Sequence, residues 1–339
     1  MTVLPPGSTI GILGGGQLGR MLAMAAARLG LKCHIYSDHS GPAFDVAAAS
    51  TVGKYEDLEA VARFAEMVDV VTYEFENVPC ATAEAAAAIR PVRPGVKALE
   101  VAQDRLVEKK FIAALDIPVA PFAPVDCYAS LTRAASELGL PAILKTRRLG
   151  YDGKGQMRLS SAADLTSARA AIGSAPAILE GMVQFEIEVS VLVVRGQGGE
   201  MRFYDVPHNT HANGILDTST VPAPVSQKTR EQACEIAGTI ASALDYVGVL
   251  AVEMFYCGES APQPLVVNEI APRVHNSGHW TIDACAVNQF ENHIRAVAGW
   301  PLGHTERHSD AVMTNLIGAD VEAWEKLACE PAAGLHLYG

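Results

Sequence analysis

Two glutamates lie in segments where a charge is costly. Glu253 interrupts the apolar run 249–255, and Glu269 follows Asn268 in the apolar run 264–270. A turn-rich link joins the runs, which predicts an antiparallel hairpin with both acids side by side. Buried carboxylates need a cationic partner, and neither run contains Lys or Arg, so the pattern favours Mg²⁺. The alternative is one glutamate at a solvated strand end and the other paired with a distant arginine.

A second group of residues can surround phosphates. Lys145 lies near the end of the apolar run 142–146, and Gly-Tyr-Asp-Gly-Lys-Gly-Gln follows at 150–156. The three glycines leave backbone N–H groups accessible, so this segment is predicted to be a mobile loop that closes over phosphates. It is not a Walker A motif, because G-x-x-x-x-G-K-[ST] is absent from the sequence. A simple hairpin turn would not explain the neighbouring Arg147 and Arg148.

Residues further along the chain can complete a nucleotide site. The segment 178–183 offers backbone donors and acceptors to an adenine edge, and Glu188 on the following strand can accept hydrogen bonds from both ribose hydroxyls. A single glutamate is more often solvated than a ligand. The order and spacing of the whole set therefore indicate an ATP-binding site.

The N-terminus carries a motif that points elsewhere. Gly14 to Gly19 fits G-x-G-x-x-G between a strand and a helix, and Asp38 follows the next strand, as in dinucleotide-binding proteins. Physically, the motif specifies only a tight turn at which a phosphate or carboxylate can approach backbone N–H groups. A monophosphate would suit it equally well, and close packing of helix on strand would also require it.

Together these residues resemble the ATP-grasp family. That resemblance rests on Lys145, the 150–156 loop, 180–183, Glu188, Glu253 and Asn268-Glu269. More closely, the sequence resembles the family of 5-(carboxyamino)imidazole ribonucleotide synthases of purine biosynthesis. The motifs concerned span the chain: Gly14 to Gly19, Tyr73 to Pro79, Gln103-Asp104-Arg105, Gly150 to Gln156, His208-Asn209-x-His211 and Asn276 to Thr281.

The resemblance implies an ATP site between a central and a C-terminal domain. Arg105 and Lys145 would meet the phosphates, Glu180 and Val183 the adenine, and Glu188 the ribose. The full implied set is Arg105, Lys145, Gly150, Tyr151, Asp152, Gly153, Lys154, Gly155, Gln156, Glu180, Gly181, Met182, Val183, Glu188, His211, Asn268 and Glu269. Mg²⁺, bound together with ATP, would be held by Glu253, Glu269 and Asn268.

The resemblance also implies a ribonucleotide site and a set of catalytic residues. The ribonucleotide would contact Gly15, Gly16, Gln17, Leu18, Glu76, Tyr151, Asp152, Asn276 and Ser277. The implied catalytic residues are Lys145, Tyr151, Asp152, Arg273 and His279, with Asp152 or His279 accepting the proton of the amine. Family members continue past Leu335 to Gly339 with a lysine and an arginine for the substrate phosphate. We therefore expect a trimmed chain or an incomplete phosphate site.

The implied activity is carboxylation of the 5-amino group of 5-aminoimidazole ribonucleotide by ATP and bicarbonate through carboxyphosphate. A glycinamide ribonucleotide ligase or a formate-using transformylase would share the nucleotide residues and differ in the acceptor pocket. An NAD-dependent dehydrogenase leaves Glu253 and Glu269 unexplained. A non-catalytic ATP-binding regulator would not need to retain both of these carboxylates.

The elements that must position these residues fall into three regions. Strands at 9–13, 32–36 and 68–75 alternate with helices at 17–29 and 81–89, which predicts a parallel sheet with helices on its faces. A Pro- and Gly-rich break at 90–95 precedes a helical stretch over 96–115. Later we expect helices at 128–138, 161–172, 227–244 and 283–298, and strands at 142–146, 177–179 and 186–194.

The expected fold class is α/β and α+β. In the terms of the resemblance, this is an ATP-grasp fold with a Rossmann-like N-terminal domain (1–95), a central lid domain (96–185) and a C-terminal mixed-sheet domain (186–339).

Composition limits the class of protein. The 339 residues include 49% hydrophobic ones and carry a formal net charge of −12, which argues against a broad nucleic-acid or anionic-membrane surface. Seven scattered cysteines form no C-x-x-C pair, which is typical of a reducing compartment. No apolar run is long enough to span a membrane. We expect a soluble, cytoplasmic enzyme, and the resemblance implies a homodimer.

Overall fold

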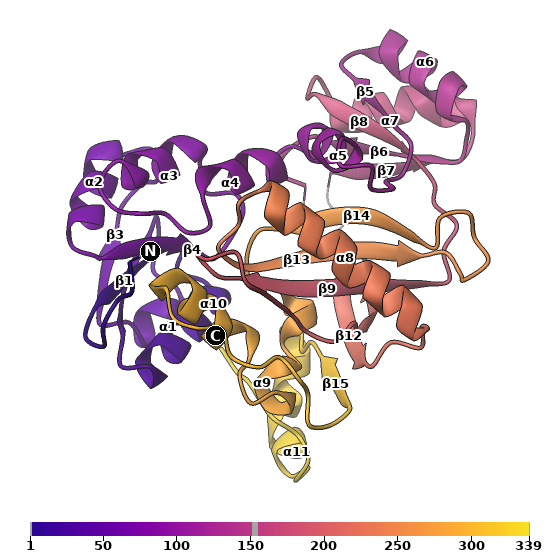
Figure 1. Cartoon of the computed structure of the whole chain (residues 1–339). Coiled ribbons are helices and arrows are strands. Elements are labelled where there is room, and N and C mark those ends of the chain that lie inside the picture. Colours follow the sequence, from indigo (N-terminus) through magenta and orange to yellow (C-terminus); the bar gives the residue numbers. More distant parts are fainter. Residues whose placement is uncertain (1, 151–154, 339) are drawn as a thin grey trace.

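A computed structural model describes residues 2–150 and 155–338, and three sheets organise these residues (Figure 1). The N-terminal sheet is parallel, as predicted, with the strand order β3-β2-β1-β4. Its strands are β1 (Thr9–Leu13), β2 (Lys32–Ser37), β3 (Ala49–Val52) and β4 (Val70–Tyr73). Its helices are α1 (Gln17–Arg28), α2 (Leu58–Glu66) and α3 (Cys80–Ala87), with a 3₁₀ turn η1 (Pro42–Asp45). Strand β3 and helix α2 were not predicted from the sequence.

Two helices, rather than one, connect this sheet to the next. They are α4 (Val96–Ala102) and α5 (Arg105–Ala113). The break falls at Gln103 and Asp104 because Asp104 caps α5, where its carboxylate accepts the N–H groups of Leu106 at 3.0 Å and Val107 at 3.4 Å. The predicted helical stretch over 96–115 is therefore interrupted at a residue that starts a new helix.

The central sheet has four antiparallel strands in the order β5-β8-β6-β7. They are β5 (Phe122–Val125), β6 (Ala142–Thr146), β7 (Gln156–Leu159) and β8 (Ala177–Gly181). Helices α6 (Tyr128–Leu138) and α7 (Leu165–Ile172) cover it, and a 3₁₀ turn η2 (Ala162–Asp164) replaces the first turn of the helix predicted over 161–172. Figure 1 shows this unit set apart from the other two sheets.

The third sheet has seven strands in the order β14-β13-β9-β11-β12-β15, with β10 also paired to β9. They are β9 (Ile187–Arg195), β10 (Met201–Phe203), β11 (His208–Ala212), β12 (Ile215–Val221), β13 (Gly248–Tyr256), β14 (Leu265–Ala271) and β15 (Ala311–Thr314). Every strand pair in it is antiparallel among the described residues, in contrast to the expected mixed sheet.

Both faces of this sheet are covered, which explains the continuous apolar runs of β9 and β13. Val191 and Val193 pack toward α8 (Gln227–Ala243), whereas Leu192 and Val194 share a core with α1 and α10 (Gln289–Ala298). The core around α1 and α10 joins the N-terminal sheet to the third sheet. The remaining short elements are η3 (Asn276–Gly278), α9 (Thr281–Ala284), η4 (Gly318–Ala323) and α11 (Trp324–Ala328).

The helix predicted over 283–298 is split into α9 and α10. Asn288 starts α10 as its N-cap, because its side-chain oxygen accepts the N–H of Glu291 at 3.0 Å. None of the helices in the described part of the chain combines the length and the apolar composition that crossing a membrane requires.

Candidate active site

Side chains from the N-terminal, central and third sheets meet in one cleft of about 440 Å³. Its polar lining includes Glu76, Arg105, Glu108, Lys145, Gln156, Glu188, His211, Glu253, Asn268, Glu269, Arg273, His275 and Asn276. Most of the predicted nucleotide and metal residues that lie in the described part of the chain are thus brought together. The cleft is strongly charged, which suits a polyanionic ligand together with a cation.

The acidic hairpin is confirmed. Strands β13 and β14 are antiparallel, and Glu253 lies directly opposite Glu269. The register then shifts, because Met254 pairs with Val267 and leaves Asn268 as an extra residue of β14. Consecutive residues of a regular strand point to opposite faces, whereas a bulge can re-aim them. Asn268 and Glu269 consequently both line the cleft.

The pKa values of the two hairpin glutamates are shifted in opposite directions. Burial and the opposing charge of Glu253 raise the pKa of Glu269. Burial would also raise the pKa of Glu253, but His275, whose Nε2 lies 3.2 Å from the carboxylate, together with the charges of His211 and Arg273, outweighs burial and lowers this pKa. Like charges opposite one another across a strand pair repel. The repulsion at this point of the hairpin would be relieved by a bound cation.

The donor set fits Mg²⁺ supported by a ligand. The described residues contain no group of three or more His, Cys, Asp or Glu side chains arranged to hold a metal ion. Two carboxylates and the Asn268 amide oxygen would therefore have to share the ion with substrate oxygens. Mg²⁺ is usually bound in this way, through one or two carboxylates plus phosphates and water.

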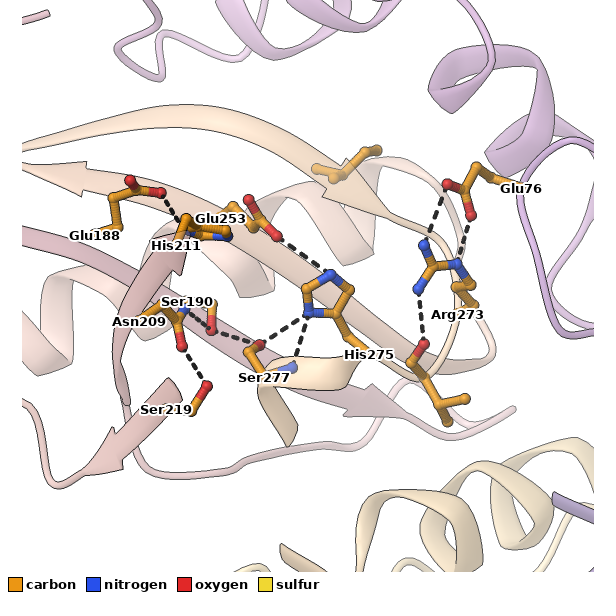
Figure 2. Close-up of polar contacts among 12 residues, drawn as sticks. Glu76, Glu188, Ser190, Asn209, His211, Ser219, Glu253, Arg273, His275 and Ser277 are labelled. Atoms are coloured by element: carbon orange, nitrogen blue, oxygen red, sulfur yellow. Dashed lines mark hydrogen bonds and ion pairs between the residues drawn. The ribbon is translucent and has the colours of Figure 1, made fainter. Parts of the chain in front are cut away.

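A chain of buried polar groups sets the orientation of His275 (Figure 2). His275 Nδ1 is 2.9 Å from Ser277 Oγ, which is 2.7 Å from Ser190 Oγ. Asn209 Nδ2 donates to Ser190 Oγ at 2.9 Å, and Ser219 Oγ donates to Asn209 Oδ1 at 2.7 Å. His275 was not predicted from the sequence, although it lies two residues after Arg273 and directly precedes the Asn276 to Thr281 motif. Ser277 is fully buried with its hydroxyl engaged, so its predicted ribonucleotide contact stays a prediction.

Lys145 has a carboxylate partner that the sequence analysis did not connect to it. Lys145 Nζ donates to Glu180 Oε2 at 2.9 Å, and Lys109 Nζ lies 3.6 Å from the same oxygen. Burial alone would raise the pKa of Glu180, but the two lysines lower it. Glu180 Oε1 is buried and has no hydrogen-bond partner among the described residues. This side chain therefore holds two cations together, and its predicted contact with adenine stays a prediction.

Arg105 ties helix α5 to the start of the glycine-rich loop. Its guanidinium donates to the carbonyl oxygens of Gly150 at 2.7 Å and Thr146 at 3.2 Å. Alongside it, Arg147 forms a bidentate ion pair with Asp104 at 2.9 and 2.7 Å. The predicted site residues Tyr151, Asp152, Gly153 and Lys154 lie outside the described residues.

The predicted ribose residue is close to the predicted histidine. Glu188 on β9 and His211 on β11 both line the cleft, with Oε2 and Nδ1 3.0 Å apart (Figure 2). The adjacent Glu188 carboxylate raises the pKa of His211 despite burial. Gly181, Met182 and Val183 continue from the end of β8 and do not line this cleft, so their nucleotide contacts stay predictions.

The N-terminal glycine turn is already filled by the protein itself. Glu74, only 6% exposed, directs its carboxylate at the start of α1, where it accepts the N–H groups of Gly16 and Gly19. Gly14 has a φ of +116°, which favours glycine. The turn thus receives a carboxylate from the chain. The predicted ribonucleotide contacts of Gly15, Gly16, Gln17 and Leu18 stay predictions, and these residues do not line the cleft.

An ion pair joins the acidic hairpin to the N-terminal sheet. Arg273, just after β14, binds both carboxylate oxygens of Glu76 (Figure 2), one of them at 3.2 Å. Burial would lower the pKa of the Arg273 guanidinium, but Glu76 raises it. Both residues line the cleft, as does Asn276. The structure thus brings a predicted catalytic residue and a predicted ribonucleotide residue into direct contact.

His279 is not brought to this cleft. It lines a separate cavity of about 470 Å³ together with Trp280, Asp283 and His336. Its Nδ1 is 3.1 Å from Gln289 Nε2, and burial lowers the pKa of His279 to about 3. A base this weak, outside the cleft, is poorly placed to accept a proton there.

Comparison with known proteins agrees with this geometry. Residues 110–290 match the ATP-grasp domain family, and residues 7–103 match the ribonucleotide synthetase preATP-grasp domain family. The chain belongs to the ATP-grasp family, and its fold is the predicted one.

Full-length relatives narrow the family further. The chain is 54% identical over all of its length to the N5-carboxyaminoimidazole ribonucleotide synthase of Brucella melitensis biotype 1, of which it covers 93%. A crystal structure of an ADP complex of N5-carboxyaminoimidazole ribonucleotide synthetase superposes with a TM-score of 0.96 at 42% identity, covering 100% of this chain and 90% of that one.

A further crystal structure contains ADP together with the predicted acceptor. It is the N5-carboxyaminoimidazole synthase of Aspergillus clavatus with ADP and 5-aminoimidazole ribonucleotide, and it matches at 31% identity with a TM-score of 0.89, covering 98% of this chain and 89% of that one. The chain is therefore an ATP-grasp ligase of the N5-carboxyaminoimidazole ribonucleotide synthase family, as the sequence analysis predicted.

Proposed function

We propose that the cleft binds ATP and Mg²⁺ and carboxylates the 5-amino group of 5-aminoimidazole ribonucleotide in purine biosynthesis. The observation that carries the proposal is the Glu253–Glu269 pair, in the same cleft as Lys145 and Arg105. Carboxylates and cations that line the same cleft suit a nucleotide phosphate with its metal ion. The full-length family match supports the choice of acceptor.

The first step, formation of carboxyphosphate, would use different residues for the phosphate groups and for the metal ion. Bicarbonate reacts only after one of its oxygens becomes a leaving group, so the γ-phosphoryl group of ATP is transferred to it to form carboxyphosphate. Such a transfer is mostly a matter of positioning and charge neutralisation. Lys145 and Arg105 would hold phosphate oxygens, and Mg²⁺ on Glu253, Glu269 and Asn268 would neutralise the charge that develops.

In the second step, the 5-amino nitrogen forms a bond to the carboxyl carbon. The bond between that carbon and the phosphate oxygen breaks, and the amine loses a proton. Direct attack on carboxyphosphate and attack on CO₂ released beside it give the same carbamate, ADP and phosphate. Carboxyphosphate hydrolyses readily, so water must be excluded from the cleft. Of the two predicted proton acceptors, Asp152 is the one we retain, since His279 lies in another cavity.

The deciding experiment follows ADP release by the purified protein. We expect release to require bicarbonate and 5-aminoimidazole ribonucleotide together, with the carbamate formed in equal amount. Phosphoribosylamine with glycine, and glycinamide ribonucleotide with formate, serve as control substrates for the two related activities. ADP release supported by either control pair, or reduction of NAD to NADH by a hydride-donating substrate, would contradict the proposal.

Assembly and location also belong to the proposal. We infer a homodimer in the cytoplasm from the family resemblance. Light scattering of the purified chain tests the first part, and a monomer at micromolar concentration would contradict it.

A further inference from the structure

Helix α5 buries two adjacent charged residues that the proposed mechanism does not use. Glu108 is 3% exposed and Lys109 is 1% exposed. Such residues are almost never this deeply buried unless they are paired. Neighbouring Lys110 on the same helix is exposed. The position of Glu108 and Lys109 therefore requires a structural or functional explanation.

Both side chains contact the backbone of β14 on either side of Glu269. Lys109 Nζ donates to the carbonyl oxygen of Asn268 at 2.9 Å. Glu108 Oε1 accepts the N–H of Ile270 at 2.7 Å. The two contacts thus enclose the peptide groups that orient the predicted metal ligand.

These contacts occur where the sheet provides no partner. Strand β14 is the edge strand of the seven-stranded sheet and carries the bulge at Asn268. Edge strands and bulges leave backbone groups without ladder partners, and such groups are costly when buried. Nearer the start of β14, the carbonyl oxygen of Pro118 accepts the N–H of Val267 at 2.8 Å. Helix α5 and the segment after it therefore take the place of an eighth strand.

We propose that Glu108 and Lys109 are positioning residues that hold the β14 bulge so that Asn268 and Glu269 face the metal together. The inference rests on the proposed function. Without the bulge, the strand alternation would turn one of these two side chains away from the cleft. A side chain that fixes the backbone of a ligand acts on the metal from outside its coordination shell, and loss of such support typically lowers metal affinity about 10- to 100-fold.

Lys109 extends this support to the nucleotide side of the cleft. Its ammonium group lies 3.6 Å from Glu180 Oε2, the oxygen that also accepts from Lys145. One buried cation thus contacts both the metal-binding strand and the partner of the predicted phosphate lysine. A change at Lys109 should therefore weaken the metal site and also disturb Lys145, whereas a change at Glu108, which does not contact Glu180, should act chiefly on the metal site.

The test compares Glu108→Leu with Glu108→Gln in the full-length protein. Leucine cannot accept the Ile270 N–H, whereas the amide oxygen of glutamine can. Binding of Mn²⁺ to the ADP-saturated protein is followed by electron paramagnetic resonance, which does not depend on turnover. We expect affinity for Mn²⁺ to fall about 10- to 100-fold in Glu108→Leu. Glu108→Gln should restore most of it, and Lys110→Met, the matched surface control, should leave it unchanged.

The proposed positioning role can be overturned by the following results. Folded Glu108→Leu and Lys109→Met proteins with the Mn²⁺ affinity of the parent would overturn the proposal. If Glu108→Leu does not fold, hydrogen exchange at the Ile270 amide of the parent takes its place. Slow exchange supports the contact, and exchange as fast as at a free strand edge overturns it. The variant Glu269→Gln in the same assay tests the metal site itself. An unchanged Mn²⁺ affinity in this variant would contradict the proposed function, on which the positioning role of Glu108 and Lys109 depends.

Discussion

The turn at the start of α1 and the hairpin β13–β14 both contain buried glutamates, but with opposite consequences. At the turn, Glu74 accepts two backbone N–H groups, so charge and donors satisfy each other within the chain. At the hairpin, Glu253 and Glu269 oppose one another, and His275 supports only Glu253. The turn has the better-known sequence motif, yet it is the hairpin that retains a carboxylate without a cationic partner of its own. An unpaired charged group therefore indicates the binding site better than the motif does.

The largest expected effect is at the hairpin. Glu269→Gln removes a charge and keeps the side-chain size, so the fold should persist while turnover falls at least about 10³-fold, since metal stabilisation of the transition state is worth several kcal/mol. Nucleotide binding should weaken chiefly when Mg²⁺ is present. The measurement is ADP formation, with the exposed Glu235→Gln as the control. Near-normal turnover would remove the metal assignment.

At the turn, stability rather than binding should respond. Glu74→Ala leaves the N–H groups of Gly16 and Gly19 without their acceptor, which should cost about 3 kcal/mol of unfolding free energy. Inorganic phosphate should stabilise the variant more than the parent, because only the variant has free N–H groups at the turn. Urea unfolding measures both, and Glu84→Ala on the exposed side of α3 is the control. An unchanged unfolding free energy would mean that the carboxylate does not satisfy the turn.

Like the Glu74 carboxylate, the buried imidazole of His293 finds its hydrogen-bond partners within the chain. His293 contacts Thr72 Oγ1 through Nε2 at 2.9 Å and accepts the Val249 N–H through Nδ1 at 3.1 Å, which joins the first and third sheets. Burial lowers the pKa of His293 to about 3. An unfolded histidine titrates near pH 6.5, so below that pH the unfolded state binds a proton that the folded state does not. Stability should therefore fall as pH drops from about 6.5 toward 3.

The pKa shift of His293 should lower the free energy of unfolding by about 2 kcal/mol at pH 5. His293→Gln should be less stable than the parent at pH 7 but should lose up to about 2 kcal/mol less between pH 7 and pH 5. His279 contributes in the same direction and persists in the variant, so the pH dependence shrinks without vanishing. Urea unfolding at the two pH values measures this, with exposed His304→Gln as the control. Equal pH dependence in variant and parent would contradict the assignment.

The smallest expected effect concerns the N-terminal glycine turn, where we expect no dinucleotide to bind. Because Glu74 already occupies the N-terminus of α1, NAD and NADP should give no saturable heat in calorimetry with the parent protein. Gly16→Val is the matched variant, since an added Cβ there would lie 2.9 Å from the Glu74 carboxylate. Saturable heat that is lost in Gly16→Val would establish dinucleotide binding at the turn and reverse the comparison.

Local patterns were sufficient for much of the fold. Strands β1 and β6 and helix α6 begin and end at the predicted residues, because each combines a clear apolar period with flanking turn residues. Errors came where a side chain caps a helix inside a helical pattern, at Asp104 and Asn288. Strand β3 escaped prediction because its residues are largely exposed and carry little hydrophobic signal.

The sequence by itself determined the hairpin, its two opposed glutamates and the family, because those depend on residue type and short spacing. Only the tertiary structure decided which charges are already matched. Glu74 lies 58 residues from Gly16, and Glu108 lies 162 residues from Ile270, and no local pattern reports such contacts. The bulge that brings Asn268 and Glu269 to one face is likewise decided by register and by helix α5. Electrostatic partners depend on distance in space, which a chain sets only once its sheets have packed.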